Sequence, residues 1–387
     1  GSEMCIRDSS DTAPGELVRA IVTKEARGYV EATVIESLEL SSDRIAVPCE
    51  VFETCGGCQL QHLPVQKQRE MKLDLVESYL RTRGIVSEGR VQLAGEDLPD
   101  FSYRNRVTVH ISSSGAVGFY RKGTGEVVAT DSCLIASDIV NAGIRKLHLI
   151  AGAIGGLAPS VVIEESESGP VVICKTASET TADQLERVRV AVEREFDSFE
   201  IRRGRKVHYQ SPPFSQRDKE AWGHFSQVNS HANSILIDLV LSLVEGTVID
   251  DLYAGSGNFS FPLADQGARV RAVEFNKNLV SIGTRATALR GQDSEVQFIQ
   301  STCERFVKNN ALAPCVLLDP PRAGALEVVK RVRPEQTQSL VYVSCSLPTF
   351  ARDAQKLIEA GYRLEVVHLV DMFPQTHHVE LVSRFVV

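Results

Sequence analysis

The sequence has no run of apolar residues long enough to cross a bilayer, and its first residues lack the apolar stretch of a secretory signal peptide. These absences argue against a membrane-spanning protein, so we expect a cytoplasmic protein with no membrane partner. We also expect it to be a monomer. Internal repeats and low-complexity tracts are missing as well. With 387 residues, 43% of them hydrophobic, the chain is long enough for two or three domains.

A positive net charge is also absent, because the formal net charge is −8. That balance counts against a protein that binds nucleic acid, since phosphate groups attract lysine and arginine. Basic residues are nevertheless dense in places, for example over residues 202–206. A basic stripe on an acidic protein remains compatible with this composition.

The nine cysteines do not suit a disulfide framework, because their number is odd and no secretory signal is visible. Three of them, Cys49, Cys55 and Cys58, lie within ten residues, and Gly56 and Gly57 separate the last two. This spacing predicts a metal site, for which Cys133 is the candidate fourth ligand. An iron–sulfur cluster fits, because glycine amides could point at inorganic sulfides, and zinc on four thiolates is the alternative.

The chain divides into four parts by pattern. Residues 1–13 fit no element and read as a tag or artefactual sequence, so Cys5 receives no role. Residues 14–48 contain short β-branched segments, including one at 44–47, which suggest part of a small barrel. Residues 49–215 read as an antiparallel α+β domain that holds the cysteine motif and helices near 64–83 and 181–195.

Residues 216–387 alternate between apolar strands and helices, which predicts a doubly wound α/β domain with a mostly parallel sheet. Ligands of such sheets bind at the carboxyl ends of the strands. Gly255 and Gly257 follow one of these strands and open a helix, and Glu274 ends the next strand. This arrangement fits S-adenosylmethionine, which has ribose hydroxyls for an acid to bind but no pyrophosphate.

Three further candidates also lie at strand ends in this part of the chain. Asp319 ends a core strand before two prolines, and Cys345 ends the next one, where a thiolate would be a good nucleophile. Glu380 begins the last strand and could act as a general base. His377 and His378 precede it and form a weaker candidate pair, with no third metal ligand nearby.

Five motifs carry a resemblance to a known family: FSQVN (225–229), DLYAGSGNFS (251–260), LLDPPRAGA (317–325), YVSC (342–345) and DMFPQTHHVE (371–380). In order and spacing they resemble the RNA uracil-C5 methyltransferase family, which has a Rossmann-like fold and uses S-adenosylmethionine. The resemblance implies that Cys345 is the nucleophile and Glu380 the base. It also implies the cofactor-site positions Gln227, Tyr253, Gly255, Gly257, Asn258, Glu274, Thr302 and Asp319.

The segment PCEVFETCGGCQLQHL (48–63) resembles the branch of this family that carries a [4Fe–4S] cluster on four cysteines. That resemblance implies Cys49, Cys55, Cys58 and Cys133 as ligands and 23S ribosomal RNA as the substrate. A cluster-bearing archaeal relative acts on transfer RNA, so this substrate is the alternative. Residues 15–37 are similar to the second half of a TRAM domain, a small RNA-binding barrel, which implies that its first strands are missing.

Two positions depart from the family pattern. Ser346, Leu347 and Pro348 follow Cys345, where the family usually has Asn-Pro, and Ala254 stands where the family often has cysteine. The altered loop after Cys345 is the one feature that favours a non-catalytic RNA-binding factor. Retention of both Cys345 and Glu380 favours an enzyme instead, because simple RNA binding would need neither. The same pair argues against an enzyme that methylates an amino group, since that reaction needs no cysteine nucleophile.

Overall fold

The computed structural model describes residues 12–26, 29–87, 89–204, 206–211 and 227–387. Cys5 and most of the predicted artefactual stretch lie outside these residues, as do Phe225 and Ser226 of the first family motif. Within the described part of the chain, no helix is both long and apolar enough to cross a membrane.

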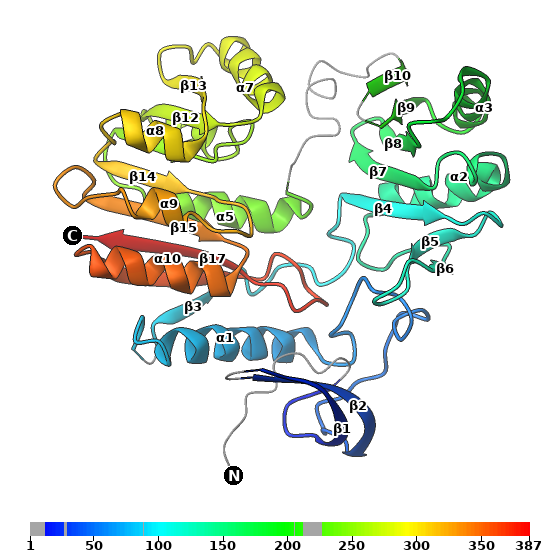
Figure 1. The fold of residues 1–387 in the computed structure, drawn as a ribbon, viewed down its shortest axis with the longest axis horizontal. Helices are drawn as coiled ribbons and strands as arrows, with labels where there is room; N and C mark the ends of the chain where they lie inside the picture. The colour runs from blue at the N-terminus through cyan, green and yellow to red at the C-terminus, as the bar shows by residue number, and fades with distance from the viewer. Residues whose placement is uncertain (1–11, 27–28, 88, 205, 212–226) are drawn as a thin grey trace.

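The larger sheet has eight strands in the order β13-β12-β11-β14-β15-β17-β16-β3 (Figure 1). Their bounds are β3 (Val91–Ala94), β11 (Val248–Leu252), β12 (Arg269–Glu274), β13 (Val296–Gln300), β14 (Cys315–Leu318), β15 (Ser339–Ser344), β16 (Arg363–Val370) and β17 (Glu380–Val386). The first five strands in this order are parallel, whereas β17 runs antiparallel to both of its neighbours. The predicted α/β fold with a mostly parallel sheet is thereby confirmed.

Helices cover both faces of this sheet, which explains why its central strands β14 and β15 are buried at every position. In β15, Leu340 and Tyr342 enter one core cluster, while Val341 and Val343 enter the other. The helices are α1 (Val65–Arg81), α5 (Ser230–Leu243), α6 (Ser260–Asp265), α7 (Lys277–Arg290), α8 (Cys303–Asn309), α9 (Leu326–Val329) and α10 (Leu347–Glu359).

Two elements of the predicted central range, α1 and β3, belong to this sheet instead. β3 pairs with β16 at the sheet edge, and α1 buries Val76 and Leu80 in the core beside β15 and β17. The boundary predicted at residue 215 therefore does not separate the two sheets along the chain. Periodicity alone predicts a helix over 64–83 but cannot tell which sheet its apolar side covers.

The second sheet has seven strands in the order β10-β9-β8-β7-β4-β5-β6. Their bounds are β4 (Arg106–Ile111), β5 (Val117–Tyr120), β6 (Val127–Ala129), β7 (Ser160–Ser166), β8 (Gly169–Thr176), β9 (Ser198–Arg203) and β10 (Lys206–Gln210). The helices α2 (Asp138–Ile154) and α3 (Ala182–Glu193) pack on it and form its core.

Helix α2 is not among the helices that the sequence predicts for residues 49–215. Its N-cap is Ser137, whose side chain accepts a hydrogen bond from Val140 N. Gly143 lowers the helical signal but is needed in the fold, because a Cβ there would lie 2.6 Å from the Ile163 side chain. Close packing of the helix on β7 thus explains the glycine.

The N-terminal part contains one antiparallel hairpin of β1 (Leu17–Ala26) and β2 (Tyr29–Glu39). The strand predicted at 44–47 does not form, and Ile45 N instead donates to His62 O across 3.0 Å. Large apolar side chains of the hairpin, including Ile21 and Ile35, are more than half exposed. Two strands cannot close a barrel, so a TRAM-like barrel is not present among the described residues.

The packing of α1 on the large sheet leads to a stability prediction. Leu80→Ala should lower the free energy of unfolding by about 2–5 kcal/mol, because Leu80 is fully buried in the core shared with β15 and β17. Leu75→Ala, on the exposed side of the same helix, should change it by less than about 0.5 kcal/mol. Urea denaturation of the full chain measures both, and equal effects would contradict the assigned packing.

Candidate functional site

The loop after β11 is shaped by residues in left-handed backbone conformations. Tyr253, Gly255 and Gly257 have φ values of 67°, 59° and 104°. A Cβ at Gly255 would meet nothing within 4 Å, whereas one at Gly257 would lie 2.6 Å from Phe261. Gly255 therefore leaves open space beside the loop, and Gly257 allows close packing below it. A left-handed tyrosine costs about 1–3 kcal/mol, and such strain is typical of ligand sites.

Glu274 ends β12 and ties this loop to the neighbouring strand. Its carboxylate accepts hydrogen bonds from Gly255 N at 3.1 Å and from Asn276 N at 2.6 Å. A carboxylate offers about four acceptor positions, so capacity remains for the hydroxyls of a ribose. The parallel pairing of β11 with β12 places both strand ends at one edge, as the sequence predicted.

The other predicted cofactor residues lie around this loop with different local roles. Asn258 exchanges two hydrogen bonds of 3.0 Å with Asn233 of α5, and Tyr253 Oη donates to Glu304 across 3.2 Å. Gln227 precedes α5, and its carbonyl accepts a 3.3 Å hydrogen bond from Asn105 Nδ2. Thr302 caps α8 by accepting from Arg305 N, which accounts for this residue without a ligand.

Cys345 and Glu380 meet because β17 is antiparallel to β15. The pairing of Ser344 with Leu381 puts the residue after one strand's end beside the residue that begins the other. Asp319 follows β14, which pairs in parallel with β15 on the opposite side. The three predicted catalytic and acidic side chains thus gather at the carboxyl edge of the sheet.

The protonation of this group is governed by burial and by mutual repulsion. Burial raises the pKa of the Cys345 thiol, and Glu380 and Asp319 raise it further. Burial also raises the pKa of Glu380 well above its usual range, and Asp319 adds to this effect. The pKa of Asp319 is raised to about 7 by burial and by Asp251. A cation bound here would lower all three pKa values, so the site suits a positively charged sulfonium.

Arg322 and Phe275 belong to the site region but were not among the predicted site residues. The Arg322 guanidinium lowers the pKa of both Cys345 and Glu380. Its signal was present in the LLDPPRAGA motif, directly after the two prolines. Phe275 follows Glu274 and is 71% exposed, which is unusual for a large apolar side chain and leaves its ring available to a planar ligand.

The unusual residues after Cys345 form a regular helix start. Ser346 is the N-cap of α10, and Pro348 occupies the first turn, where proline is well tolerated. Thr349 Oγ1 donates to Ser346 O at 3.1 Å and to Arg322 O at 3.2 Å. The loop is therefore hydrogen-bonded despite its departure from the family pattern.

The weaker pair, His377 and His378, lies in the chain between β16 and β17. Their rings are 4.6 Å apart, and burial together with the neighbouring His377 lowers the pKa of His378 to about 4. Both features favour a neutral His378 imidazole that packs against the ring of His377.

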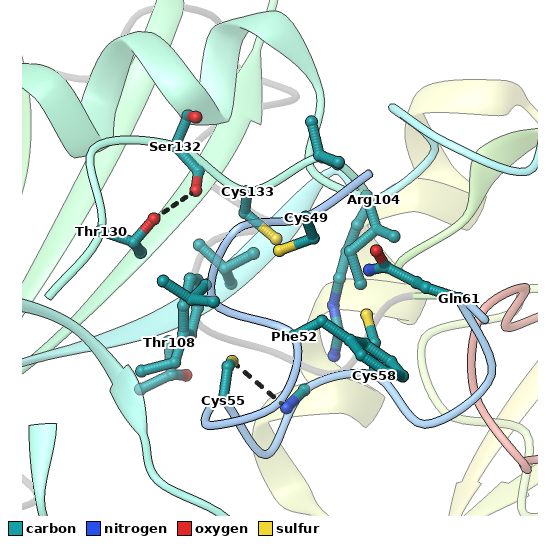
Figure 2. Close-up of a pocket in the computed structure, with 16 residues that line it drawn as sticks. Cys49, Phe52, Cys55, Cys58, Gln61, Arg104, Thr108, Thr130, Ser132 and Cys133 are labelled. Carbon is teal, nitrogen blue, oxygen red and sulfur yellow. Dashed lines mark hydrogen bonds between the residues drawn. The ribbon is translucent and has the colours of Figure 1, made fainter. Parts of the chain in front are cut away.

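The four cysteines singled out in the sequence line one cavity of about 220 Å³ (Figure 2). Cys49, Cys55 and Cys58 come from the loop before α1, and Cys133 comes from the segment before α2. Burial raises the pKa of Cys58 to about 12 and also raises the pKa values of Cys55 and Cys133. Gly57 N donates to Cys55 Sγ at 3.4 Å, so a backbone amide already points at a sulfur of this group.

The spacing of these thiols is wider than a single metal ion requires. Among the described residues, no three His, Cys, Asp or Glu side chains stand close enough to hold one ion as they are. Four sulfurs bound to one zinc would each be about 2.3 Å from the metal. The structure brings the predicted ligands to one cavity but does not by itself form a single-ion site.

Comparisons with known proteins agree with this arrangement. The family model of tRNA (Uracil-5-)-methyltransferase matches residues 189–383. The 23S rRNA (uracil(1939)-C(5))-methyltransferase RlmD of Alkalilimnicola ehrlichii is 33% identical over 96% of this chain and 89% of its own length. The protein of the same name from Neisseria lactamica is 30% identical, with the same two coverages.

A solved structure shares the fold over nearly the full chain. The Pyrococcus abyssi tRNA (uracil-54, C5)-methyltransferase in complex with S-adenosyl-L-homocysteine aligns with a TM-score of 0.74 and 23% identity. The alignment covers 98% of this chain and 95% of that one. The chain therefore belongs to the S-adenosylmethionine-dependent RNA uracil-C5 methyltransferase family.

Proposed function

We propose that this protein methylates carbon 5 of a uracil in 23S ribosomal RNA, with Cys345 as nucleophile and Glu380 as base. The observation that carries the proposal is the antiparallel pairing of β15 with β17, which brings these two side chains to one edge of the sheet. The curated relatives named above act on 23S rRNA, and they match almost the whole chain.

The chemistry requires a nucleophile because carbon 5 of uracil is itself a poor one. The Cys345 thiolate forms a bond to carbon 6, and the electron pair of the carbon 5–carbon 6 double bond moves towards carbon 5 and O4 as an enolate. S-adenosylmethionine, when bound, supplies a methyl group on a positively charged sulfur, which carbon 5 accepts. Glu380 then takes the proton from carbon 5, the double bond re-forms, and the bond between Cys345 and carbon 6 breaks.

The residues around the β11 loop would hold the cofactor. Glu274 has free acceptor positions for ribose hydroxyls, and the open space at Gly255 allows close approach. Asp319 lies between this loop and Cys345, because Asp319 N donates to Leu252 O and its carboxyl is close enough to influence Cys345. The binding loop would be completed by Tyr253, Gly257 and Asn258, with Gln227 beside it. Thr302 is the weakest of these assignments, because it already caps α8.

A [4Fe–4S] cluster on Cys49, Cys55, Cys58 and Cys133 is our second proposal for a bound group. The four cysteines line one cavity, but no three described His, Cys, Asp or Glu side chains stand close enough for one ion, which favours a polyatomic cluster over a single zinc ion. The raised thiol pKa values fit either metal, since metal binding deprotonates its thiol ligands. A structural role is expected, because the cluster would tie the loop before α1 to the segment before α2.

Transfer RNA remains the alternative substrate, because the Pyrococcus abyssi enzyme of the same fold acts on tRNA. A non-catalytic RNA-binding role is disfavoured by the joint presence of Cys345 and Glu380 at one sheet edge. The regular start of α10 also removes the structural objection that the residues after Cys345 raised.

One prediction of the proposed function tests the reaction and the substrate together. Labelled methyl groups from S-adenosylmethionine should appear as 5-methyluridine in a 23S rRNA transcript, and Cys345→Ala should lower this incorporation by at least about 10³-fold. Cys315→Ala should retain activity, because this thiol lies at the start of β14, away from the carboxyl edge of the sheet that carries Asp319 and Cys345. Label on a tRNA transcript alone would overturn the substrate, and no label on either RNA would overturn the reaction.

A second prediction concerns pH. Methyl transfer should rise with pH, because burial raises the pKa of Cys345 and the thiolate is the reactive form. Arg322→Ala removes a positive charge that lowers this pKa, so the midpoint of the pH–rate profile should move upward by about one pH unit or less. Arg322→Lys should largely restore the midpoint, and Arg331→Ala on the surface should leave it in place. An unchanged midpoint in Arg322→Ala would contradict the inference that Arg322 lowers the pKa of Cys345.

A third prediction separates the two metals. Protein purified without oxygen should show a visible absorbance shoulder and contain iron and sulfide, and Cys133→Ser should lose most of both. Ser132→Ala, at a neighbouring residue that lines the same cavity, should keep them. Bound zinc without the shoulder would replace the cluster with a zinc site.

A further inference from the structure

The chain between β16 and β17, residues 371–379, leads directly to Glu380 and is held by four separate parts of the protein. We call it the 371–379 segment. Four successive carbonyls accept hydrogen bonds from outside it: Met372 O from Asn229 Nδ2 (3.0 Å), Phe373 O from Lys72 Nζ (3.1 Å), Pro374 O from Tyr103 Oη (2.9 Å) and Gln375 O from Gln59 N (2.9 Å) and Leu60 N (3.1 Å). Its shape therefore depends on partners and not on a helix or strand ladder.

One side of α1 holds the beginning and the middle of this segment. Asp371 is fully buried and contacts Arg69 Nε at 3.2 Å and Lys72 Nζ at 2.7 Å. Gln68 and Gln375 bond reciprocally, since Gln68 Nε2 donates to Gln375 Oε1 at 2.8 Å and Gln375 N donates to Gln68 Oε1 at 2.9 Å. Both glutamines are buried, so these amide groups have no water to replace a lost partner.

Gln375 adopts a left-handed backbone conformation, with φ of 69°. Such a conformation is unfavourable for a residue with a Cβ, and it persists where the surroundings determine it. Here the surroundings are the bonds to Gln68 and the two backbone amides on Gln375 O. The position thus stores strain in the middle of the chain that leads to the base.

The two amides that bind Gln375 O belong to the cysteine loop. Gln59 and Leu60 directly follow Cys58, and Gln59 Nε2 also donates to Gly56 O within the cysteine motif at 3.0 Å. Two backbone hydrogen bonds therefore connect the loop that carries three of the four cysteines with the chain five residues before Glu380. Cys345 and Asp319 instead follow β15 and β14, which pair with each other within the large sheet.

We infer that Gln375 is a positioning residue for Glu380 and that it couples the order of the cysteine loop to the proton-abstraction step. The inference rests on the proposed function. Glu380 is the first ladder residue of β17, so the sheet holds the chain after it and the 371–379 segment holds the chain before it. Loosening the segment should therefore slow release of the covalent RNA adduct, while the earlier attack by Cys345 and the methyl transfer continue.

The experiment follows single turnovers of the full chain, purified without oxygen, on the RNA that the wild type methylates. Methyl incorporation reports the earlier steps, and decay of the covalent protein–RNA band on a denaturing gel reports elimination. Gln375→Gly removes the side-chain bonds and accepts the left-handed backbone, and it should slow adduct decay about 10- to 100-fold with methyl transfer changed less than about threefold. Gln375→Asn keeps an amide and tolerates this backbone, so it should restore part of the decay rate.

Two comparisons keep the result interpretable. Gln336→Gly makes the same chemical change at an exposed loop position and should match the wild type. Glu380→Gln should trap the adduct and so gives the limit for a lost base. A Gln375→Gly protein in which methyl transfer and adduct decay slow equally would have a general structural defect, and that result overturns the inference. No methylation or adduct in the wild type would instead overturn the proposed function.

Coupling to the cysteine loop has its own readout, which does not depend on activity. Removing bound metal from the wild type with a chelator should increase hydrogen–deuterium exchange in peptides that cover the 371–379 segment. It should also slow adduct decay in the wild type but add little further slowing to Gln375→Gly, because loss of the side-chain bond to Gln68 already loosens the backbone whose carbonyl the two loop amides hold. Unchanged exchange in this segment, or fully additive slowing, would refute the coupling.

Discussion

The site depends on one structural constraint, the insertion of an antiparallel β17 between β15 and β16. A parallel sheet presents only strand ends at its ligand edge, so a strand beginning there must run the other way. Reversal of β17 places Glu380 beside Cys345, although the 34 residues 346–379 separate them in the chain. In the proposed reaction, Cys345 and Glu380 would then act on the two carbons of one reacting double bond without either leaving its strand end.

Burial disfavours the charged forms of the three groups at the carboxyl edge of the sheet. Cys345, Glu380 and Asp319 all have raised pKa values, and Arg322 is the neighbouring cation that opposes the shift for the first two. A low-dielectric cleft strengthens each such interaction, so a positively charged ligand would favour the thiolate and the carboxylate together. In the proposed mechanism, electrostatics would thus link cofactor binding to deprotonation of the Cys345 thiol.

Helix α1 joins the parts of the protein that the reaction needs in one place. It follows the cysteine loop, packs its apolar side on the large sheet, and uses Arg69 and Lys72 to bind the buried Asp371. Burial lowers the pKa of Lys72, while Asp371 favours its charged form. Removing one member of such a buried group leaves an uncompensated charge, which typically costs about 3–5 kcal/mol. The same helix that completes the core therefore also determines the path of the chain towards Glu380.

Local pattern was sufficient for the parts of this protein whose signals are local. Alternation of apolar strands and helices predicted the α/β fold, the helix near 64–83 and the strand ends that carry Glu274, Asp319 and Cys345, because periodicity and strand-end position reflect the backbone geometry of each element. The cysteine motif likewise indicated Cys133 as the candidate fourth partner of the three earlier cysteines, and all four line one cavity.

Features that depend on contacts between distant segments were decided by the tertiary structure alone. The segment at 44–47 has a strand-like composition but finds no strand partner, and α2 forms although its glycines weaken the helical pattern, because Gly143 must pack closely on Ile163. No local pattern shows that β3 joins the sheet of residues 248–386, or that Gln375 bonds to Gln68, which lies 307 positions earlier in the chain. Composition and periodicity determine which elements form and which residue types they carry, whereas burial and long-range hydrogen bonding determine which of them meet.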